Sequence, residues 1–308
     1  MRIIITGGTG LIGRALSAEL AADGHEVIVL SRAPQRARGL ASGVRAERWD
    51  GRSGDGWAGL ADGAGAIVNL AGANISGEGL FPTRWTGERK RLIGQSRADA
   101  GRAVVDAVRQ ASRKPGVVIQ ASGIGIYGAR GDDPVAEDGS FGQDFLARVA
   151  VQEWEPSTEP VEAMGVRRAI VRNAVVLSKT DGALRPMVLQ FRLFAGGPIG
   201  SGRQWLSWIH LKDEAGAIRF LIENERASGP FNLVAPQAAT NAQFARTLGR
   251  VMGRPSWLPL PGFAMKAAFG EVADLLLTGQ RGVPQRLVEL GFQFRFPELE
   301  GALRDTLA

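Results

Sequence analysis

Short apolar runs alternate with amphipathic stretches through the first 180 residues of this 308-residue chain. The longest stretch of helical period runs from about residue 84 to residue 112, and a proline at position 115 follows it. Residues 3–5 form a short β-branched run that is predicted to be a buried parallel strand. Further strands are predicted at residues 27–30, 44–49, 66–72 with its exit turn, 117–122 and 166–171, the last continuing through 172–177. This pattern predicts an α/β fold with a doubly wound, mainly parallel Rossmann sheet.

The alternation stops after Leu177. Residues 181–206 are amphipathic and glycine-rich, and residues 231–234 have the pattern of a strand that returns to the main sheet. Residues 236–308 are mostly helical in pattern and are interrupted by prolines. We therefore predict a Rossmann domain made of residues 1–180 plus about 213–235, and a smaller, mostly helical substrate domain made of about 181–212 plus 236–308.

A glycine-rich turn follows the first predicted strand. Gly8, Gly10 and Gly13 fit G-x-G-x-x-G, and Thr6 with Gly7, Gly10 and Gly13 fits T-G-x-x-G-x-x-G. Such glycines allow a tight turn and a close approach of the backbone to a pyrophosphate, which the helix N-terminus attracts; the alternative is a turn that holds no ligand. A dinucleotide is expected to contact Gly7, Thr9, Gly10, Leu11, Ile12, Gly13, Ser31, Arg32, Leu70, Ala71, Gly72 and Ala121.

The cofactor type depends on the residues after the second strand. An acidic residue there would hold the ribose 2′-OH of NAD, but the chain has Ser31-Arg32, with Arg36 and Arg38 nearby. An arginine can pair with a 2′-phosphate through its planar guanidinium, so the sequence favours NADP(H); the alternative is a solvated arginine in a loop. Asn69, at the end of the fourth strand, could contact the cofactor or be a structural hydrogen-bonding residue inside the sheet.

Composition narrows the class of protein. The 37 basic and 31 acidic side chains give a net charge of +6, but no basic run of five occurs, so we expect no nucleic-acid partner. The chain contains no cysteine, which excludes disulfides and thiolate metal sites, and we expect no metal. No apolar run is long enough for a bilayer, and the glycine-rich turn stands where the apolar core of a signal peptide would run. We expect a cytoplasmic protein with a small-molecule substrate; its oligomeric state is left open.

Several motifs together resemble the extended short-chain dehydrogenases/reductases, the NAD(P)-dependent epimerase/dehydratase proteins. Besides the glycine turn, these are residues 69–72, 122–128, 172–177 and 208–213. Three further stretches resemble one atypical branch, whose members carry the names nucleoside-diphosphate-sugar epimerase or cell-division inhibitor: residues 84–90, 145–149 with Trp154-Glu155, and the C-terminal block 258–307. The resemblance covers essentially the whole chain and implies a catalytic serine at Ser122.

One departure from the family pattern bears on catalysis. Active members use a Tyr-x-x-x-Lys pair, but the corresponding helix here has Phe145 and Val149 at those positions. Arg148 lies one position short of the lysine, about 100° around the helix. The remaining candidates for moving a proton are Ser122, Tyr127, His210 and solvent. Tyr127, the only tyrosine, either donates the proton or lines the pocket with its ring, and His210 more simply fits a structural histidine at a strand–helix junction.

Three functions remain after these observations. The first is an oxidoreductase that binds NADPH and reduces a small carbonyl or related substrate, with Ser122 and Tyr127 as catalytic candidates. The second is a non-catalytic, NADP(H)-dependent sensor or binding module, which the missing Tyr-x-x-x-Lys pair favours. The third is a nucleotide-sugar epimerase, which is least favoured because that chemistry depends on the missing tyrosine.

Overall fold

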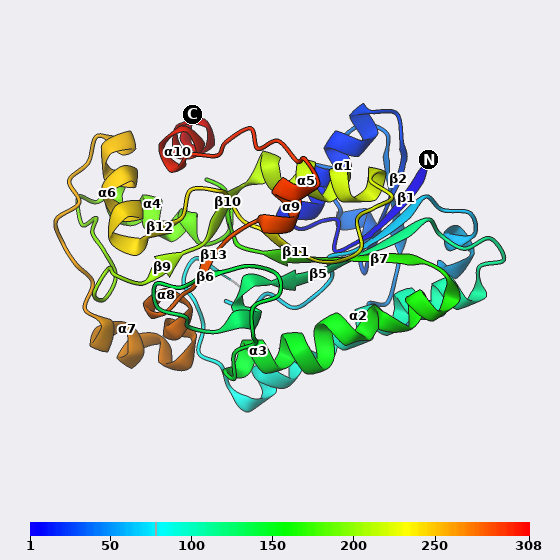
Figure 1. Cartoon of the computed structure of the whole chain (residues 1–308), viewed down its shortest axis with the longest axis horizontal. Helices are drawn as coiled ribbons and strands as arrows, with labels where there is room; N and C mark the ends of the chain where they lie inside the picture. Colours follow the sequence, from blue (N-terminus) through cyan, green and yellow to red (C-terminus); the bar gives the residue numbers. More distant parts are fainter. Residues whose placement is uncertain (78) are drawn as a thin grey trace.

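A seven-stranded parallel sheet forms the centre of the computed structural model, which describes residues 1–77 and 79–308 (Figure 1). Its strand order is β11-β7-β5-β4-β1-β2-β3, and every neighbouring pair is parallel. The strands are β1 (Arg2–Thr6), β2 (Glu26–Ser31), β3 (Val44–Arg48), β4 (Ala66–Asn69), β5 (Val117–Gly123), β7 (Arg167–Asn173) and β11 (Gly229–Leu233). The predicted Rossmann sheet is confirmed, including the return of residues 231–233 to it beside β7.

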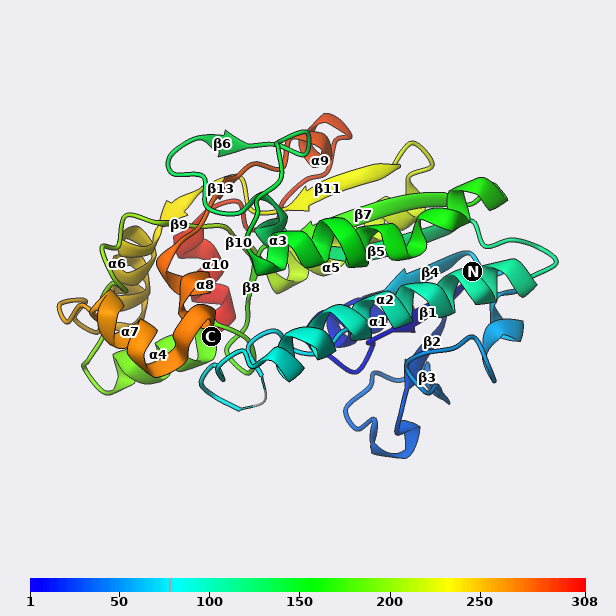
Figure 2. The same cartoon turned by 90° about the horizontal axis from the view of Figure 1, so that it is seen from below.

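Helices cover both faces of this sheet (Figure 2). α1 (Leu11–Ala22) and α5 (Leu211–Glu223) pack on one face, while α2 (Gly87–Gln110) and the helical segment 150–164 pack on the other. Because side chains alternate along a strand, Ile3 and Ile5 belong to the core under α1 and α5, whereas Ile4 belongs to the core under α2. Apolar residues on both faces explain why the inner strands β1, β2 and β4 are hydrophobic runs in the sequence.

The sixth predicted strand ends earlier than expected. β7 stops at Asn173, and residues 175–177 form β8 (Val175–Leu177), which pairs with β10 (Trp208–His210) in a separate two-stranded sheet. The Ala174 N–H donates to the Leu233 carbonyl and the next N–H, of Val175, donates to the Ser207 carbonyl. The chain therefore changes partners at Ala174 and leaves the main sheet there.

The region outside the sheet is mostly helical, as predicted. Phe191, Phe244 and Leu303 share one core within it. Its helices are α4 (Leu184–Arg192), α6 (Asn241–Met252), α7 (Gly262–Phe269), α8 (Asp274–Leu277), α9 (Gln285–Glu289) and α10 (Leu299–Leu307). The remaining elements are the helix α3 (Phe145–Val149) and four short strands, β6 (Pro134–Val135), β9 (Trp205–Leu206), β12 (Ala239–Thr240) and β13 (Arg281–Gly282). None of the helices in residues 1–77 and 79–308 combines the length and apolarity that a membrane crossing requires.

The C-terminal block does not stay within the predicted second domain. α9 packs beside β11, and Leu287 is fully buried in the same core as Ile3 and Ile5 (Figure 1). Phe292 and Phe294 also pack against that core. Residues 285–294 therefore cover part of the Rossmann sheet, because their apolar side chains complete the face that α1 and α5 leave open.

Candidate functional site

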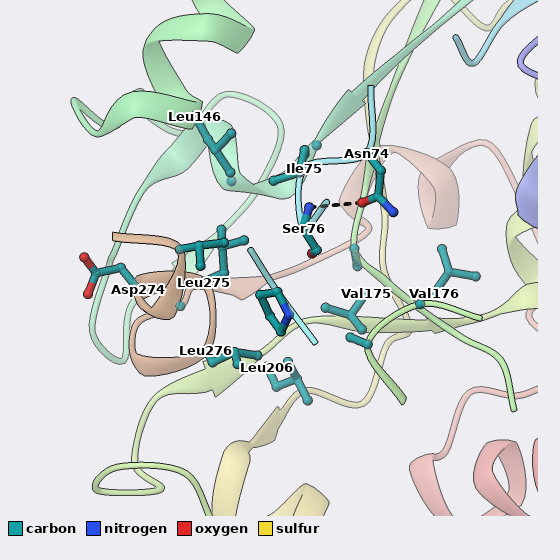
Figure 3. Close-up of a pocket in the computed structure, with 18 of the residues that line it drawn as sticks. Asn74, Ile75, Ser76, Leu146, Val175, Val176, Leu206, Asp274, Leu275 and Leu276 are labelled. Atoms are coloured by element: carbon teal, nitrogen blue, oxygen red, sulfur yellow. Dashed lines mark hydrogen bonds between the residues drawn. The ribbon is translucent and has the colours of Figure 1, made fainter. Parts of the chain in front are cut away.

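A cleft of about 1170 Å³ lies at the carboxyl edge of the sheet and is lined mainly by apolar groups. The glycine loop before α1 forms one wall, and the β5 exit with α3 forms another. The outer wall comes from residues 258–280, and Figure 3 shows Leu275 and Leu276 there, opposite Leu146 of α3. The carboxyl edge is where open parallel sheets bind their ligands, and a cleft of this size can take a dinucleotide together with a second small molecule.

The glycine loop has no room for a side chain at Gly7, Gly8 or Gly13. Gly7 has a φ of +67°, and a Cβ added at Gly13 would stand 2.4 Å from the Gly8 Cα. The Gly10 N–H donates to the Gly7 carbonyl at 3.0 Å, and Gly10 is the N-cap of α1. The first N–H groups of α1 have no partners within the helix, so they present donors and a positive helix end toward the cleft. The loop therefore has the shape and the polarity of a pyrophosphate cradle.

The predicted cofactor-contact residues occupy two kinds of place. Those that line the cleft are Gly7, Gly10, Leu11, Ile12, Gly13 and Leu70. Thr9, Ser31, Arg32, Ala71, Gly72 and Ala121 do not line the space itself. Ala121 is buried in the sheet core, so its side chain is taken up by packing. Thr9 and Ala71 flank lining residues, and Gly72 lies against Arg97.

Asn69 is a structural residue. Its Oδ1 accepts a 2.6 Å hydrogen bond from the Thr6 hydroxyl, and its Nδ2 donates to Gln120 Oε1 at 2.9 Å. The Gln120 Nε2 donates to the Ala121 carbonyl, and the Ala71 N–H donates to the Thr6 hydroxyl oxygen. This network spans the ends of β1, β4 and β5, so it fixes the floor beneath the cleft.

Arg32 follows β2 directly and is exposed. Within the described residues its guanidinium takes part in no ion pair or side-chain hydrogen bond, while its stem lies near Gly51. The Ser31 hydroxyl accepts from the Ala33 N–H at 3.2 Å, which shapes the turn after the strand. The arginine is thus available to an anionic ligand beside the glycine loop.

The helix α3 presents no proton donor to the cleft. Phe145 and Val149, which the sequence resemblance places where active proteins have tyrosine and lysine, both line the cleft. Arg148 is exposed and donates to the Gln143 carbonyl at 2.6 Å, so it faces away. The departure inferred from the sequence is therefore a property of the cleft wall itself.

The predictions that Tyr127 donates a proton to the substrate or lines the pocket with its ring are both wrong. The β5 exit winds into a 3-10 turn, Ile124–Tyr127, which carries the ring away from the cleft to a site where it is 1% exposed. Its hydroxyl donates to Asn232 Oδ1 at 2.8 Å and accepts from Arg172 Nη1 at 2.7 Å. Burial raises the pKa of Tyr127, although the charge of Arg172 opposes this. Tyr127 belongs to a buried polar network beneath β11.

Replacing Tyr127 by phenylalanine should therefore lower stability and leave ligand chemistry unchanged. The substitution removes one charge-assisted and one neutral hydrogen bond and leaves Arg172 and Asn232 with fewer partners, which costs about 1–3 kcal/mol. Urea denaturation measures this loss, and calorimetry with NADPH should give an unchanged affinity. Unchanged stability combined with impaired binding or turnover would restore Tyr127 to the site.

Ser122 and His210 also lie outside the cleft. Ser122 is 2% exposed, and Gly123, the next residue on β5, lines the cleft in its place. The Ser122 hydroxyl is therefore buried instead of lining the cleft, because side chains alternate along the strand. His210 caps α5: its Nδ1 accepts from the Lys212 N–H, and its Nε2 lies 3.2 Å from Asp305. Burial lowers the pKa of His210, and its structural role is confirmed.

A buried acid stands directly behind the cleft wall. Glu214 on α5 is fully buried, and burial raises its pKa well above the ordinary value of 4.5. The amide nitrogen of Asn173, which lines the cleft, lies 3.0 Å from Glu214 Oε1 when oriented as a donor. The protonated acid therefore holds a cleft-lining amide in place without a buried charge.

Replacing Glu214 by glutamine should stabilise the protein increasingly as the pH rises. A folded-state pKa above the unfolded value means that the contribution of the protonated acid is complete below about pH 4.5 and is lost as the pH rises toward the folded pKa. The glutamine amide cannot ionise, so the difference in unfolding free energy between variant and wild type should grow from pH 5 to pH 8. Urea titrations at both pH values measure it, and a constant difference would show that Glu214 does not titrate with folding.

Comparisons with known proteins agree with this geometry. The model of the NAD dependent epimerase/dehydratase family matches residues 3–234, and a domain of unknown function, DUF1731, matches residues 260–306. The chain belongs to the NAD dependent epimerase/dehydratase family. The resemblance inferred from the sequence motifs is confirmed.

Relatives of the family match this chain over nearly its full length. The epimerase family protein YfhF of Bacillus subtilis (strain 168) is 38% identical over 313 residues, which cover 100% of this chain and 98% of YfhF. The chloroplastic SDR39U1 homolog of Arabidopsis thaliana is 39% identical over 312 residues, covering 99% of this chain and 86% of that protein. The crystal structure of human epimerase family protein SDR39U1 (isoform 2) with NADPH has a TM-score of 0.87 at 36% identity and covers 99% of both chains.

The sequence did not predict two of the residues that line the cleft. Arg97 on α2 and Trp154 both line the cleft. Arg97 stands on the buried stripe of α2, with Ile93, Ala100 and Val104 at helical spacing. A charged residue on an otherwise apolar stripe was the signal that could have found it.

Proposed function

We propose that this protein is an NADP(H)-dependent oxidoreductase that acts on a small substrate bound in the apolar cleft. The observation that carries the proposal is the glycine cradle at Gly7–Gly13, whose backbone would have to shift to accept a single Cβ at Gly13, at one wall of a cleft of about 1170 Å³. Family membership supports a nicotinamide dinucleotide, and the human relative crystallised with NADPH supports the phosphorylated form. The rest of the cleft has room for a substrate beyond the dinucleotide.

The cofactor would be held by the glycine loop, by the N-terminus of α1 and by side chains beside them. The α1 N-terminus meets the pyrophosphate, and Arg32 supplies a guanidinium for the 2′-phosphate. Leu11, Ile12 and Leu70 provide apolar contact beside the cradle. When bound, the nicotinamide supplies hydride chemistry, while the protein contributes orientation and a dry environment.

The cleft wall determines how a proton can move. Phe145 and Val149 exclude water from one side of the cleft and offer no proton. Tyr127 and His210 are buried elsewhere, and Ser122 does not face the cleft. Of the four candidates, solvent remains as the proton source, which fits a substrate whose reduction needs little general-acid assistance.

The experiment that tests this function follows NADPH oxidation against a panel of aldehydes, ketones, quinones and nucleotide sugars. We expect turnover with an acceptor of the carbonyl or quinone classes. A Gly13→Ala variant serves as the control for cofactor-dependent activity and should need about 10²-fold more NADPH for the same turnover. Epimerase turnover with retained NAD(H) would contradict the proposal.

A second function is favoured by Phe145 and Val149. Their lack of ionisable groups fits a sensor or binding module that holds NADP(H) and a ligand without turnover. Tight NADPH binding with no oxidation by any acceptor of the panel would favour this alternative.

A further inference from the structure

Arg97 is a buried cation without a counter-ion among the described residues. Its side chain is 5% exposed, and its Nη1 donates to the carbonyls of Ala73 (3.1 Å) and Ile93 (3.0 Å). Its Nε is buried and makes no hydrogen bond within residues 1–77 and 79–308. Burial, reinforced by the charge of Arg89, lowers the pKa of Arg97 to about 10, so the group stays charged near neutrality.

A second unpartnered donor stands beside this guanidinium. The Arg97 Cζ lies 4.4 Å from the centroid of the Trp154 ring, and the Trp154 Nε1–H is also buried without a hydrogen-bond acceptor in the described part of the chain. Both residues line the cleft. Trp154 ends a π-helical turn, Ala150–Trp154, and such turns are frequent at functional sites.

The two donors lie where adjacent strands end. A Cβ on Gly72, just after β4, would stand 3.1 Å from the Arg97 Cζ, and a Cβ on Gly123, at the end of β5, would stand 3.9 Å from the Trp154 ring. β4 and β5 are neighbours in the sheet. The absence of side chains at these glycines thus lets the guanidinium and the indole pack closely against the ends of the two strands at the floor of the cleft.

Burying a charge without a counter-ion is expensive, and an unmade hydrogen bond at each of two neighbouring donors adds to that cost. An oxyanion that reaches both groups would remove these costs at once. Neutral acceptors would satisfy the hydrogen bonds but not the charge.

We propose that Arg97 and Trp154 form an oxyanion-binding subsite in the cleft, which takes a carboxylate or phosphate group. The inference rests on the proposed function in treating the cleft as the ligand site. The anion has two possible sources, a phosphate of the dinucleotide or an acidic group of the substrate.

The test records the Trp154 indole N–H signal in proton–nitrogen correlation spectra of the full-length protein, assigned with a Trp154→Phe variant. One arm titrates NADPH into the free protein. The other titrates succinate and, separately, inorganic phosphate into the NADPH-saturated protein, and also into the free protein. A shift in the first arm assigns the anion to the cofactor, and a shift in the second assigns it to the substrate.

The Arg97→Met variant keeps the length of the side chain and removes its charge. We expect the affinity for the anion that moves the Trp154 signal to fall by about tenfold or more, with Arg97→Lys weakened less. The subsite is overturned if no titration moves the Trp154 signal, or if Arg97→Met binds every probe as the wild type does. If Arg97→Met has a lower thermal stability but unchanged affinities, Arg97 only holds the loop at Ala73. Failure of NADPH to bind the wild type contradicts the proposed function instead, and the free-protein titrations still decide the subsite.

Discussion

Replacing Glu155 by glutamine lowers the free energy of unfolding by about 3–5 kcal/mol, the loss typical of a broken buried ion pair. Glu155 Oε1 and Oε2 accept from Arg172 Nε and Nη2 at 2.9 and 3.0 Å, and the arginine is 3% exposed. Arg172 also donates to Tyr127 and to the Glu137 carbonyl, so a neutral partner leaves a buried guanidinium charge within a connected network. Guanidinium chloride titrations followed by circular dichroism measure the loss.

Glu162→Gln is the matched control, because it lies on the same helical segment. Glu162 pairs with Arg168 at 2.7 Å; Arg168 is buried, but the Glu162 side chain is 50% exposed, so solvent screens this pair and its loss should cost less than the loss of the Glu155 pair. If Glu155→Gln cost no more than Glu162→Gln, the network around Arg172 would not be a stabilising centre.

Replacing Gly13 by alanine should lower the affinity for NADPH by about 10²-fold. The new Cβ would stand 2.4 Å from the Gly8 Cα and 2.7 Å from the Gly7 carbonyl oxygen, and both are backbone atoms that cannot rotate away. The loop must therefore shift, and a displacement of about 1 Å at a positioned group can cost a factor of this size. Isothermal titration calorimetry measures the affinity.

Gly301→Ala serves as the control for this substitution. Gly301 lies in α10, where an added Cβ meets nothing within 4 Å. Its NADPH affinity should equal that of the wild type. Wild-type affinity in Gly13→Ala would show that the dinucleotide does not depend on the geometry of this loop.

The sequence predicted the parts of the site whose chemistry follows from local pattern. The glycines of the first turn have fixed spacing, and Phe145 with Val149 stand at fixed helical positions, so both could be placed before the structure was known. The return of residues 231–233 to the sheet followed from a short apolar run after a helix. In each case the information lies within a few adjacent residues.

The predictions were wrong or incomplete where the direction of the chain, or packing between distant residues, decides which side chains reach the cleft. Ser122 lies on the expected strand and Tyr127 follows it, but strand alternation directs Ser122 away from the cleft and the 3-10 turn at residues 124–127 directs Tyr127 away from it. Arg97 was missed because its burial depends on the packing of α2 and of the segment containing Trp154. The packing of α9 on the Rossmann core depends on contacts between residues far apart in the sequence, such as Leu287 with the sheet.

Calorimetric titration with NADPH and NADH, on the wild type and on Arg32→Asp, tests the central claim most directly. A charge-assisted contact between Arg32 and the 2′-phosphate is worth about 1.5–3 kcal/mol, so wild-type protein should bind NADPH about tenfold or more tightly than NADH. The aspartate variant should lose that preference, because it repels the phosphate and offers an acceptor to the ribose hydroxyl. Equal affinities for the two cofactors in the wild type would contradict the account.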